Sequence, residues 1–263
     1  MSLKNLLTLI AMTATLVAAV PSARADKLED IIQSGVIKIA VPADFPPFGS
    51  VGKDGQAEGY DVEVAKLVAR DLGVKLELVP VTSPNRVAYL LTGKVDLVIA
   101  SLGANPERAK VIAFTDAYAP FYLGVFGDAK TQVQSASDLA GKTIGVTRGT
   151  IEDTELTRLA PKSATIQRFE DNNVTLSALA SAKVDVIATG SAAAGSLSRR
   201  SPGKAEKKFV LRDSPAHIGV RKDEPDVVAW LNVFIHYHQK PGGELDALAQ
   251  KWLGESLADI RRF

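Results

Sequence analysis

The chain has 263 residues, of which 46% are hydrophobic, and its 31 basic and 30 acidic side chains give a net charge of +1 with histidine neutral. This balance provides no basic field for nucleic acid or anionic lipid, so neither is an expected partner. Cysteine is absent, which excludes thiol catalysis and cysteine-based metal sites, and the length fits one large or two small domains.

The N-terminus has the pattern of a secretory signal peptide. Lys4 supplies a positive charge, an apolar run covers Leu6–Val20, and Ala23-Arg24-Ala25 fits an A-x-A cleavage site. We expect residues 1–25 to be the signal peptide, cleaved after Ala25. The alternative is an N-terminal core helix. Because this segment contains two basic residues and no acid, its loss changes the net charge from +1 to −1. Beyond it, no run reaches the roughly 18 apolar residues that a membrane span needs.

Short apolar runs alternate with helical patterns in the next part of the chain. Apolar residues recur at helical spacing from Val64 to Leu72, and Gly73 ends the pattern. The predicted strands are Val36–Val41, Lys75–Val81 and Val95–Ala100, and the predicted helices are Asp61–Leu72 and Pro84–Thr92. This β-α-β-α-β order predicts a right-handed, doubly wound α/β lobe.

The same alternation then repeats, which predicts a second α/β lobe. Its predicted strands are Lys142–Val146, Thr165–Phe169 and Val184–Thr189, and its predicted helices are Thr150–Leu159, Val174–Ala182 and Ser191–Ser198. Two apolar, β-like segments, Phe121–Phe126 and Phe209–Val220, lie between the two series and are expected to form a hinge. The segment Pro225–Phe263 is predicted to be helical, with a break at Pro241-Gly242-Gly243.

The strongest local motif is Asn105-Pro106-Glu107-Arg108. Asn is a good N-cap and Pro is favoured at the first helical position, so a helix is predicted to begin here, just after a buried strand. Ligands of open α/β sheets bind beyond the carboxyl ends of strands, and a guanidinium matches a carboxylate with two parallel hydrogen bonds. Arg108 is therefore a candidate carboxylate ligand. The alternative is an exposed arginine paired with Glu107 or Asp116.

A second motif follows the predicted strand Lys142–Val146. Gly149 permits a tight turn, Thr150 is a suitable N-cap for the next helix, and Asp153 completes a capping-box pattern. An ordinary strand-to-helix turn explains this motif equally well.

The phrases V-P-A-D-F-P-P-F, G-Y-D-V-E-V, G-K-V-D-L-V-I-A-S-L, N-P-E-R and F-T-D-A-Y occur in this order between Val41 and Tyr118. In that order they resemble the polar amino acid-binding proteins of ATP-driven importers, the bacterial extracellular solute-binding proteins of family 3. The resemblance implies a two-lobed α/β fold of the periplasmic-binding-protein type II, each lobe a doubly wound sheet, joined by a two-strand hinge. It places residues 26–120 and 214–263 in lobe 1, which is discontinuous, and residues 121–213 in lobe 2.

The resemblance also implies a site. Arg108 and Thr150 would hold one ligand carboxylate from opposite lobes, so that closure depends on the ligand. Phe45 would form a wall of the site, whereas Phe48 is assigned to the core. Backbone carbonyls and a hydroxyl at Ser101 and Leu102 would meet an ammonium or amide group. The full set of expected ligand-binding residues is Phe45, Ser83, Ser101, Leu102, Gly103, Arg108, Thr147, Thr150, Glu152 and Gly190.

Several positions depart from the pattern of the resembled family. Gly190 stands where relatives have an Asp that pairs with the ligand ammonium, and Gly103 stands where they have Ser or Thr. Ser83 replaces an aromatic residue, and Pro42 replaces the acid of members that favour basic ligands. A buried ammonium without a carboxylate partner is costly, so Glu152 is a candidate replacement for the missing Asp. The alternatives are a ligand without a free ammonium, an ammonium held by carbonyls and hydroxyls, and a Glu152 that only favours the helix dipole.

The leading hypothesis is a non-enzymatic binding protein of the periplasm that delivers an amino acid or related small carboxylate to a membrane permease. It is expected to be monomeric and to use no cofactor or metal, and His236 and His238 are spaced too closely to share a helix face. His217 is assigned to the hinge or core. One alternative is an enzyme similar to cyclohexadienyl dehydratases, whose D-N-N-V-T phrase matches Asp171–Thr175, with Glu152 as proton donor. Another alternative is a ligand-sensing domain.

Overall fold

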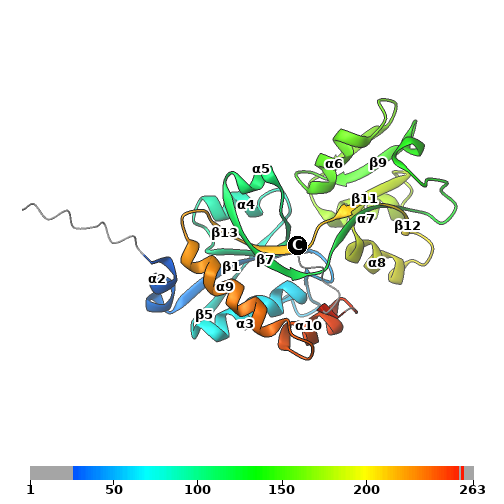
Figure 1. Ribbon diagram of the computed structural model, residues 1–263. Coiled ribbons are helices and arrows are strands. Elements are labelled where there is room, and N and C mark those ends of the chain that lie inside the picture. Colours follow the sequence, from blue (N-terminus) through cyan, green and yellow to red (C-terminus); the bar gives the residue numbers. More distant parts are fainter. Residues whose placement is uncertain (1–25, 255, 258–263) are drawn as a thin grey trace, which may run out of the picture.

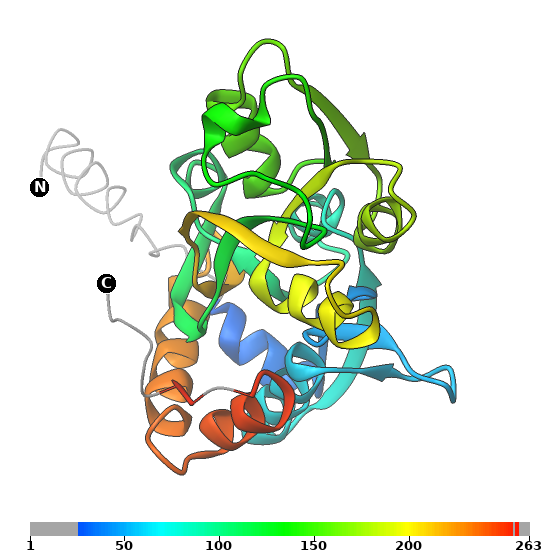
Figure 2. The same ribbon diagram turned by 90° about the vertical axis from the view of Figure 1, so that its right-hand side faces the viewer.

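The computed structural model describes residues 26–254 and 256–257, so the predicted signal peptide and the last residues of the predicted helical tail lie outside the described residues. Figure 1 shows two α/β lobes joined by extended segments, the first lobe coloured from blue through cyan to green and again in orange and red, and the second in green and yellow. Figure 2 views the same arrangement from the side, with the second lobe above the first. Within these residues no helix is both long and apolar enough to cross a membrane.

The first lobe is built on a sheet with strand order β5-β1-β6-β13-β7. Its strands are β1 (Val36–Pro42), β5 (Lys75–Val81), β6 (Leu97–Gly103), β7 (Ile112–Ala119) and β13 (Ala216–Arg221). β1 runs parallel to β5 and β6, whereas β13 is antiparallel to β6 and β7, so the sheet is mixed. Its helices are α2 (Lys27–Ser34), α3 (Tyr60–Leu72), α4 (Arg86–Leu91), α5 (Pro106–Ala109), α9 (Pro225–His238) and α10 (Glu244–Trp252).

The predicted elements of this lobe are confirmed, with ends shifted by a few residues. Helix α3 buries Val64, Leu67 and Val68 and ends at Gly73, whose φ of 71° supplies the left-handed cap. Every residue of β6 is buried, as its continuous apolar run indicated. Asn105 is the N-cap of α5, and its side chain accepts a hydrogen bond from the backbone N–H of Arg108 at 2.8 Å.

The second lobe is built on a sheet with strand order β10-β9-β11-β8-β12. Its strands are β8 (Tyr122–Gly127), β9 (Thr143–Thr147), β10 (Thr165–Phe169), β11 (Val186–Gly190) and β12 (Glu206–Asp213). Its helices are the 3₁₀ turn η1 (Ala136–Leu139), α6 (Ile151–Leu159), α7 (Asn172–Ala180) and α8 (Ser191–Arg200). The sheet is again mixed, because β8 is antiparallel to β11 and β12 while β9 is parallel to β10 and β11.

The two lobes are linked where β7 leads into β8 and where β12 leads into β13, as expected for the hinge (Figure 1). The predicted β-like segment Phe209–Val220 consists of two strands that flank Ser214-Pro215. The backbone N–H of Ser214 donates to the Phe121 carbonyl at 2.9 Å, which ties the two crossing segments together. Pro215 has no N–H to continue the ladder. A small sheet of β2 (Asp44–Phe45), β3 (Gly49–Val51) and β4 (Ala57–Glu58) was not predicted.

The C-terminal helices pack back onto the first lobe. Leu245 and Ala249 of α10 belong to the same buried cluster as Val64 of α3, and the Arg70 guanidinium is paired with the Glu244 carboxylate at 2.6 Å. This lobe is therefore assembled from both ends of the described chain.

The two histidines near the end of α9 point to different partners, which confirms that they do not share a face. His238 is buried, and its Nε2 lies 2.6 Å from an Asp71 oxygen, whereas the exposed His236 pairs with Asp116 at 2.9 Å. His217 lies half-buried in β13, with Nδ1 2.8 Å from the Thr115 carbonyl.

Candidate functional site

Side chains of both lobes enclose a narrow cavity at the carboxyl ends of β1, β5 and β6. This is the edge of an α/β sheet where ligands usually bind. The cavity volume is about 30 Å³, so a small-molecule ligand enters only when the lobes part. Of the predicted site residues, the cavity is lined by Phe45, Ser83, Ser101, Gly103, Arg108, Thr150 and Glu152, and Pro42 lies beside them.

Arg108 reaches across the boundary between the lobes. Its guanidinium donates to the Gly103 carbonyl of its own lobe at 2.8 Å and to the Gly149 carbonyl of the second lobe at 3.1 Å. Burial and the nearby Arg86 lower the pKa of Arg108 to about 9, against the opposing effect of Glu152. The group is thus a cation at neutral pH, and its remaining N–H groups are available to an anion.

Thr150 caps helix α6 at the opposite wall. Its hydroxyl accepts from the Asp153 N–H at 3.2 Å and donates to the Thr147 carbonyl at 2.9 Å, while Gly149 has the left-handed φ of 71° that the turn requires. The predicted capping box is only half formed, because the Asp153 carboxylate accepts from the N–H of Gly149 rather than of Thr150. Thr150, Ile151 and Glu152 at the start of α6 line the same cavity as Arg108. The first N–H groups of a helix have no acceptor within the helix and attract anions.

Glu152 belongs to the first turn of α6, is 7% exposed and lines the cavity. Burial raises the pKa of Glu152, and its own backbone N–H, Arg86, the Thr150 hydroxyl and Arg108 oppose that rise. It lies close enough to both guanidinium groups to interact with them, although it forms no direct ion pair with either among the described residues. The cavity thus contains a carboxyl group and two guanidinium groups.

The second guanidinium belongs to Arg86, which was not among the site residues predicted from the sequence. It is 7% exposed, begins α4 and donates to the carbonyl of Ala100 in β6. Burial lowers the pKa of Arg86, and the carboxyl groups of Glu152 and Asp44 oppose that effect. A single arginine in an amphipathic helix pattern carries no local sign that it will be buried.

Asp44 and Asn172 were also missed, although both line the cavity. Asp44 follows a strand end, which was a usable signal, but its partner is 128 positions away. Its carboxylate accepts hydrogen bonds from the backbone N–H and the side-chain amide of Asn172 across the lobes. Burial raises the pKa of Asp44, and the two Asn172 donors oppose that rise. Thr147 does not line the cavity, since its hydroxyl donates to the Asn172 side-chain oxygen at 2.8 Å from behind.

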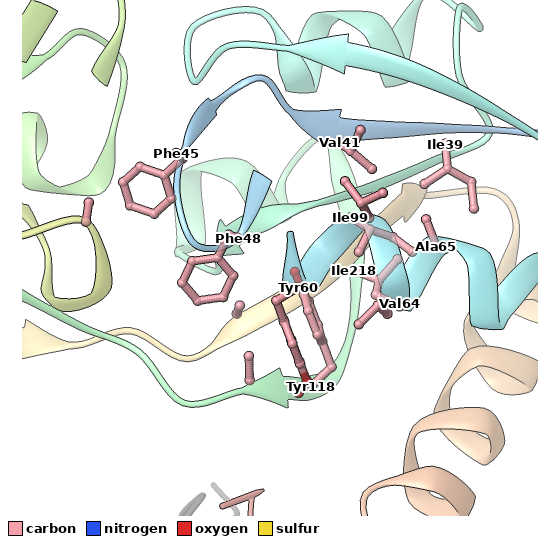
Figure 3. Packing of buried hydrophobic residues seen from close by; sticks show 14 of the residues in the cluster. Ile39, Val41, Phe45, Phe48, Tyr60, Val64, Ala65, Ile99, Tyr118 and Ile218 are labelled. Atoms are coloured by element: carbon pink, nitrogen blue, oxygen red, sulfur yellow. Dashed lines mark hydrogen bonds between the residues drawn. The ribbon is translucent and has the colours of Figure 1, made fainter. Parts of the chain in front are cut away.

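Ser101 lines the cavity in an unusual backbone conformation, with a φ of 42°. Its N–H donates to the buried Asp61 carboxylate at 2.7 Å, and the Tyr118 hydroxyl donates to the same carboxylate at 2.7 Å. Tyr60 stacks on Tyr118 with ring centroids 5.9 Å apart, as Figure 3 shows. This network behind the site holds Ser101 in a strained geometry that the chain alone would not adopt. Leu102, by contrast, is fully buried in the core and does not line the cavity.

Gly190 does not line the cavity, because the ring of Phe121 covers it. A Cβ atom at Gly190 would lie 1.9 Å from Cζ of that ring. Phe121 in turn packs edge-on against Phe45 and Phe48, with centroid distances of 6.0 and 5.6 Å. Figure 3 shows Phe45 and Phe48 side by side, and the complete burial of Phe48 confirms its assignment to the core. An aromatic ring thus occupies the space that a side chain at position 190 would need.

The space beside Gly103 is also occupied, by Ser214 between the hinge strands and by Ile151 of α6. A Cβ atom there would lie 2.5 Å from the Ser214 hydroxyl oxygen and 2.6 Å from Cδ1 of Ile151. Ser214 lines the cavity, and its buried hydroxyl has no hydrogen-bond partner among the described residues. The hydroxyl that a Ser or Thr at position 103 would contribute is therefore present, but it comes from a residue 111 positions further along the chain.

Within the described residues, no group of three or more His, Asp and Glu side chains is arranged to hold a metal ion. The cavity combines donor-only guanidinium groups with carboxyl and hydroxyl groups drawn from both lobes. This composition can hold a small carboxylate and position a second polar group beside it.

Comparison with known proteins agrees with this architecture. The L-cystine-binding protein TcyJ of Escherichia coli is 28% identical over 234 residues, which cover 88% of this chain and 87% of that protein. A cyclohexadienyl dehydratase of Pseudomonas aeruginosa is 28% identical over 206 residues, 76% of each chain. The crystal structure of a Neisseria gonorrhoeae solute receptor for L-cysteine matches with a TM-score of 0.79 and 32% identity, covering 86% of this chain and 93% of that one.

The model of one protein family matches residues 37–255, which include both lobes and all the cavity residues described above. The chain belongs to the bacterial extracellular solute-binding proteins, family 3.

Proposed function

We propose that this protein is the substrate-binding component of an ATP-driven importer, which captures an amino acid or a related small carboxylate between its lobes. The observation that carries the proposal is the position of Arg108, which lines the interlobe cavity and bridges to Gly149 beside the N-terminus of α6. A ligand carboxylate that takes the guanidinium and the helix terminus as partners would join the lobes through itself. Closure would then depend on the ligand.

The residues proposed to contact the ligand are those predicted residues that line the cavity, together with Asp44, Arg86 and Ser214. Glu152 and Asp44 are the candidates to bind a ligand ammonium group, because the Phe121 ring occupies the space beside Gly190. The lobe division proposed from the sequence, at 120/121 and 213/214, is supported by the two crossing segments at Phe121 and Ser214.

The closed form is proposed to dock on a membrane permease, with the protein acting as a monomer in the periplasm. Export by a signal peptide cleaved after Ala25 would leave Asp26 as the first residue. Asp26 is also the N-cap of α2 and accepts a hydrogen bond from Glu29 at 3.3 Å, so the proposed mature chain begins with an intact helix cap. Intact-mass measurement of the exported protein tests the cleavage position.

The function is tested by a thermal-shift screen of the mature protein against the common amino acids and their decarboxylated, N-methylated and deaminated relatives. A ligand present at a hundredfold excess over its Kd stabilises the folded state by about 2.7 kcal/mol. We expect a rise in Tm with at least one small carboxylate, and we expect Arg108→Ala to abolish it. Failure of every carboxylate to raise Tm would refute the proposal.

A second candidate function rests on Glu152, a buried carboxyl of raised pKa beside two guanidinium groups. Such a group can act as a general acid, as the alternative of a cyclohexadienyl dehydratase-like activity requires. Glu152 would protonate the leaving hydroxyl of prephenate, which departs as water while the ring carboxylate leaves as CO₂. A turnover assay with prephenate tests it, and activity that disappears in Glu152→Gln would establish an enzyme.

A further inference from the structure

Arg86 carries a hydrogen-bonding group that nothing in the described part of the chain satisfies. Its terminal NH1 donates to the Ala100 carbonyl, but its Nε is buried and has no partner there. A buried donor without an acceptor costs free energy comparable to a lost hydrogen bond, so such atoms are rare in folded proteins. Arg86 is 7% exposed and lines the same cavity as Arg108, which makes an external acceptor accessible only from the cleft.

The charged neighbours of Arg86 do not supply the missing hydrogen-bond acceptor. Glu152, Asp44 and Asp61 influence its pKa, yet none forms a direct ion pair with it among the described residues. Asp61 is engaged by Ser101 and Tyr118, and Asp44 by Asn172. The guanidinium also lies near enough to Arg108 to lower the pKa of that residue. Two neighbouring cations with spare donors favour a ligand that brings more than one acceptor.

We propose that Arg86 binds a second oxygen acceptor of the ligand, which is a side-chain carboxamide or carboxylate in addition to the carboxylate held by Arg108. This proposal rests on the proposed binding function and narrows its ligand class. A guanidinium has no acceptor and repels cations, so ligands with basic side chains are excluded. Ligands with apolar side chains would leave Nε of Arg86 unpaired in the closed cleft and bind more weakly.

The test uses pairs of ligands with the same shape and different acceptors. L-Asparagine and L-aspartate are compared with L-leucine, and L-glutamine and L-glutamate with L-homoleucine, with L-lysine and L-arginine as cationic probes. Binding to the mature protein is measured by calorimetry and by thermal shift. We expect at least one acceptor ligand to bind about tenfold or more tightly than its apolar counterpart, and the cationic probes not to bind.

The variant Arg86→Lys keeps the positive charge but replaces the planar fork with a point charge. The ratio of the Kd of the apolar ligand to the Kd of its acceptor counterpart should fall several-fold in this variant. It should remain unchanged in Arg200→Lys, which alters an exposed arginine of α8. A ratio of affinities does not respond to a general loss of stability. Since Arg86→Lys perturbs the contact with the Ala100 carbonyl, its melting temperature without ligand is recorded as a check on folding.

The proposal would be overturned by apolar ligands that bind as tightly as their acceptor counterparts, by preferred binding of lysine or arginine, or by an unchanged ratio in Arg86→Lys. Absence of binding by all of these probes would overturn it as well. The proposed binding function is tested separately. If any carboxylate binds the wild type and this binding is lost in Arg108→Ala, the binding function holds even when Arg86 has no role.

Discussion

Asp44 of the first lobe accepts two hydrogen bonds from Asn172 of the second lobe, one from its backbone N–H at 2.7 Å and one from its side-chain amide at 3.1 Å. Both bonds end on the same carboxylate oxygen and both groups line the cavity. Together with the contact between Arg108 and Gly149, they connect the lobes directly. These hydrogen bonds between the lobes stabilise the closed arrangement and must break when the lobes separate.

Removing the Asp44 carboxylate should shift the protein toward an open form. Hydrogen bonds to a charged group contribute about 1.5–3 kcal/mol, so Asp44→Ala is expected to lower the fraction of closed molecules and to weaken ligand binding roughly tenfold or more. Small-angle scattering should show a larger radius of gyration without ligand. Asp223→Ala, which removes an exposed acid of the same lobe, is the control and should leave the scattering curve unchanged.

A side chain at position 190 should conflict with Phe121. Gly190→Ala is expected to destabilise the protein by about 1–3 kcal/mol, because the ring packed against Phe45 and Phe48 must move. Chemical denaturation of Gly190→Ala, Phe121→Ala and the double variant measures the coupling, and the double variant should be more stable than the sum of the two losses predicts.

Gly195→Ala is a matched control for this experiment, since Gly195 lies in α8 and a Cβ atom there meets only the end of the Arg199 side chain at 3.6 Å. It should stabilise the helix by up to about 1 kcal/mol. Equal effects at positions 190 and 195 would contradict the role given to Phe121.

Replacing Ser214 by alanine should affect protein stability and ligand affinity differently. Its hydroxyl is buried without a partner in the described structure, so Ser214→Ala is expected to leave stability unchanged or slightly raised. The same change should weaken binding of the preferred ligand by about two- to tenfold, because a neutral hydrogen bond contributes about 0.5–1.5 kcal/mol. Calorimetry and thermal unfolding measure the two effects. Ser181→Ala, at the exposed end of α7, should not alter affinity.

Stability should fall as the pH rises from 4 to 7. Burial raises the pKa of Asp61 from 3.8 to about 7, so the folded state holds this proton more tightly than the unfolded state. The resulting stability is complete below pH 4 and is lost as the pH rises through 7, a change of about 4 kcal/mol from this group. The raised pKa values of Asp44 and Glu152 act in the same direction.

Urea denaturation of the wild type and of Asp61→Asn between pH 5 and pH 7.5 tests this prediction. The variant loses an acceptor that the Ser101 N–H or the Tyr118 hydroxyl requires, so it should be less stable at pH 5. It should also lose less stability over the pH range. An identical pH dependence in both proteins would show that Asp61 does not carry the effect.

Local chemistry was sufficient to predict most elements. The end of α3 at Gly73, the cap of α5 at Asn105 and the turn at Gly149 all depend on residues a few positions apart. The alternation of strands and helices likewise follows from apolar spacing. Capping and periodicity act within one or two turns of the chain, and for this reason they are visible without the fold.

The site was only partly predictable. Arg108, Thr150 and Glu152 line the cavity. Arg108 was predicted from a helix start beyond a buried strand, and Thr150 and Glu152 from the family resemblance. Leu102 and Thr147 occupy equivalent positions, but their side chains point into the core or behind the cavity. A strand end defines where a residue lies, whereas the direction of its side chain depends on what packs around it.

The two lobes, the family and a candidate carboxylate-binding arginine could be predicted from the sequence, because these depend on local pattern and on motifs in a characteristic order. The packed structure was needed to show what replaces the side chains absent at Gly103 and Gly190, which are the Ser214 hydroxyl and the Phe121 ring. It also revealed that Arg86 is buried near Arg108. These outcomes depend on contacts between residues far apart in the chain, and their distances exist only once both lobes and the hinge have packed together.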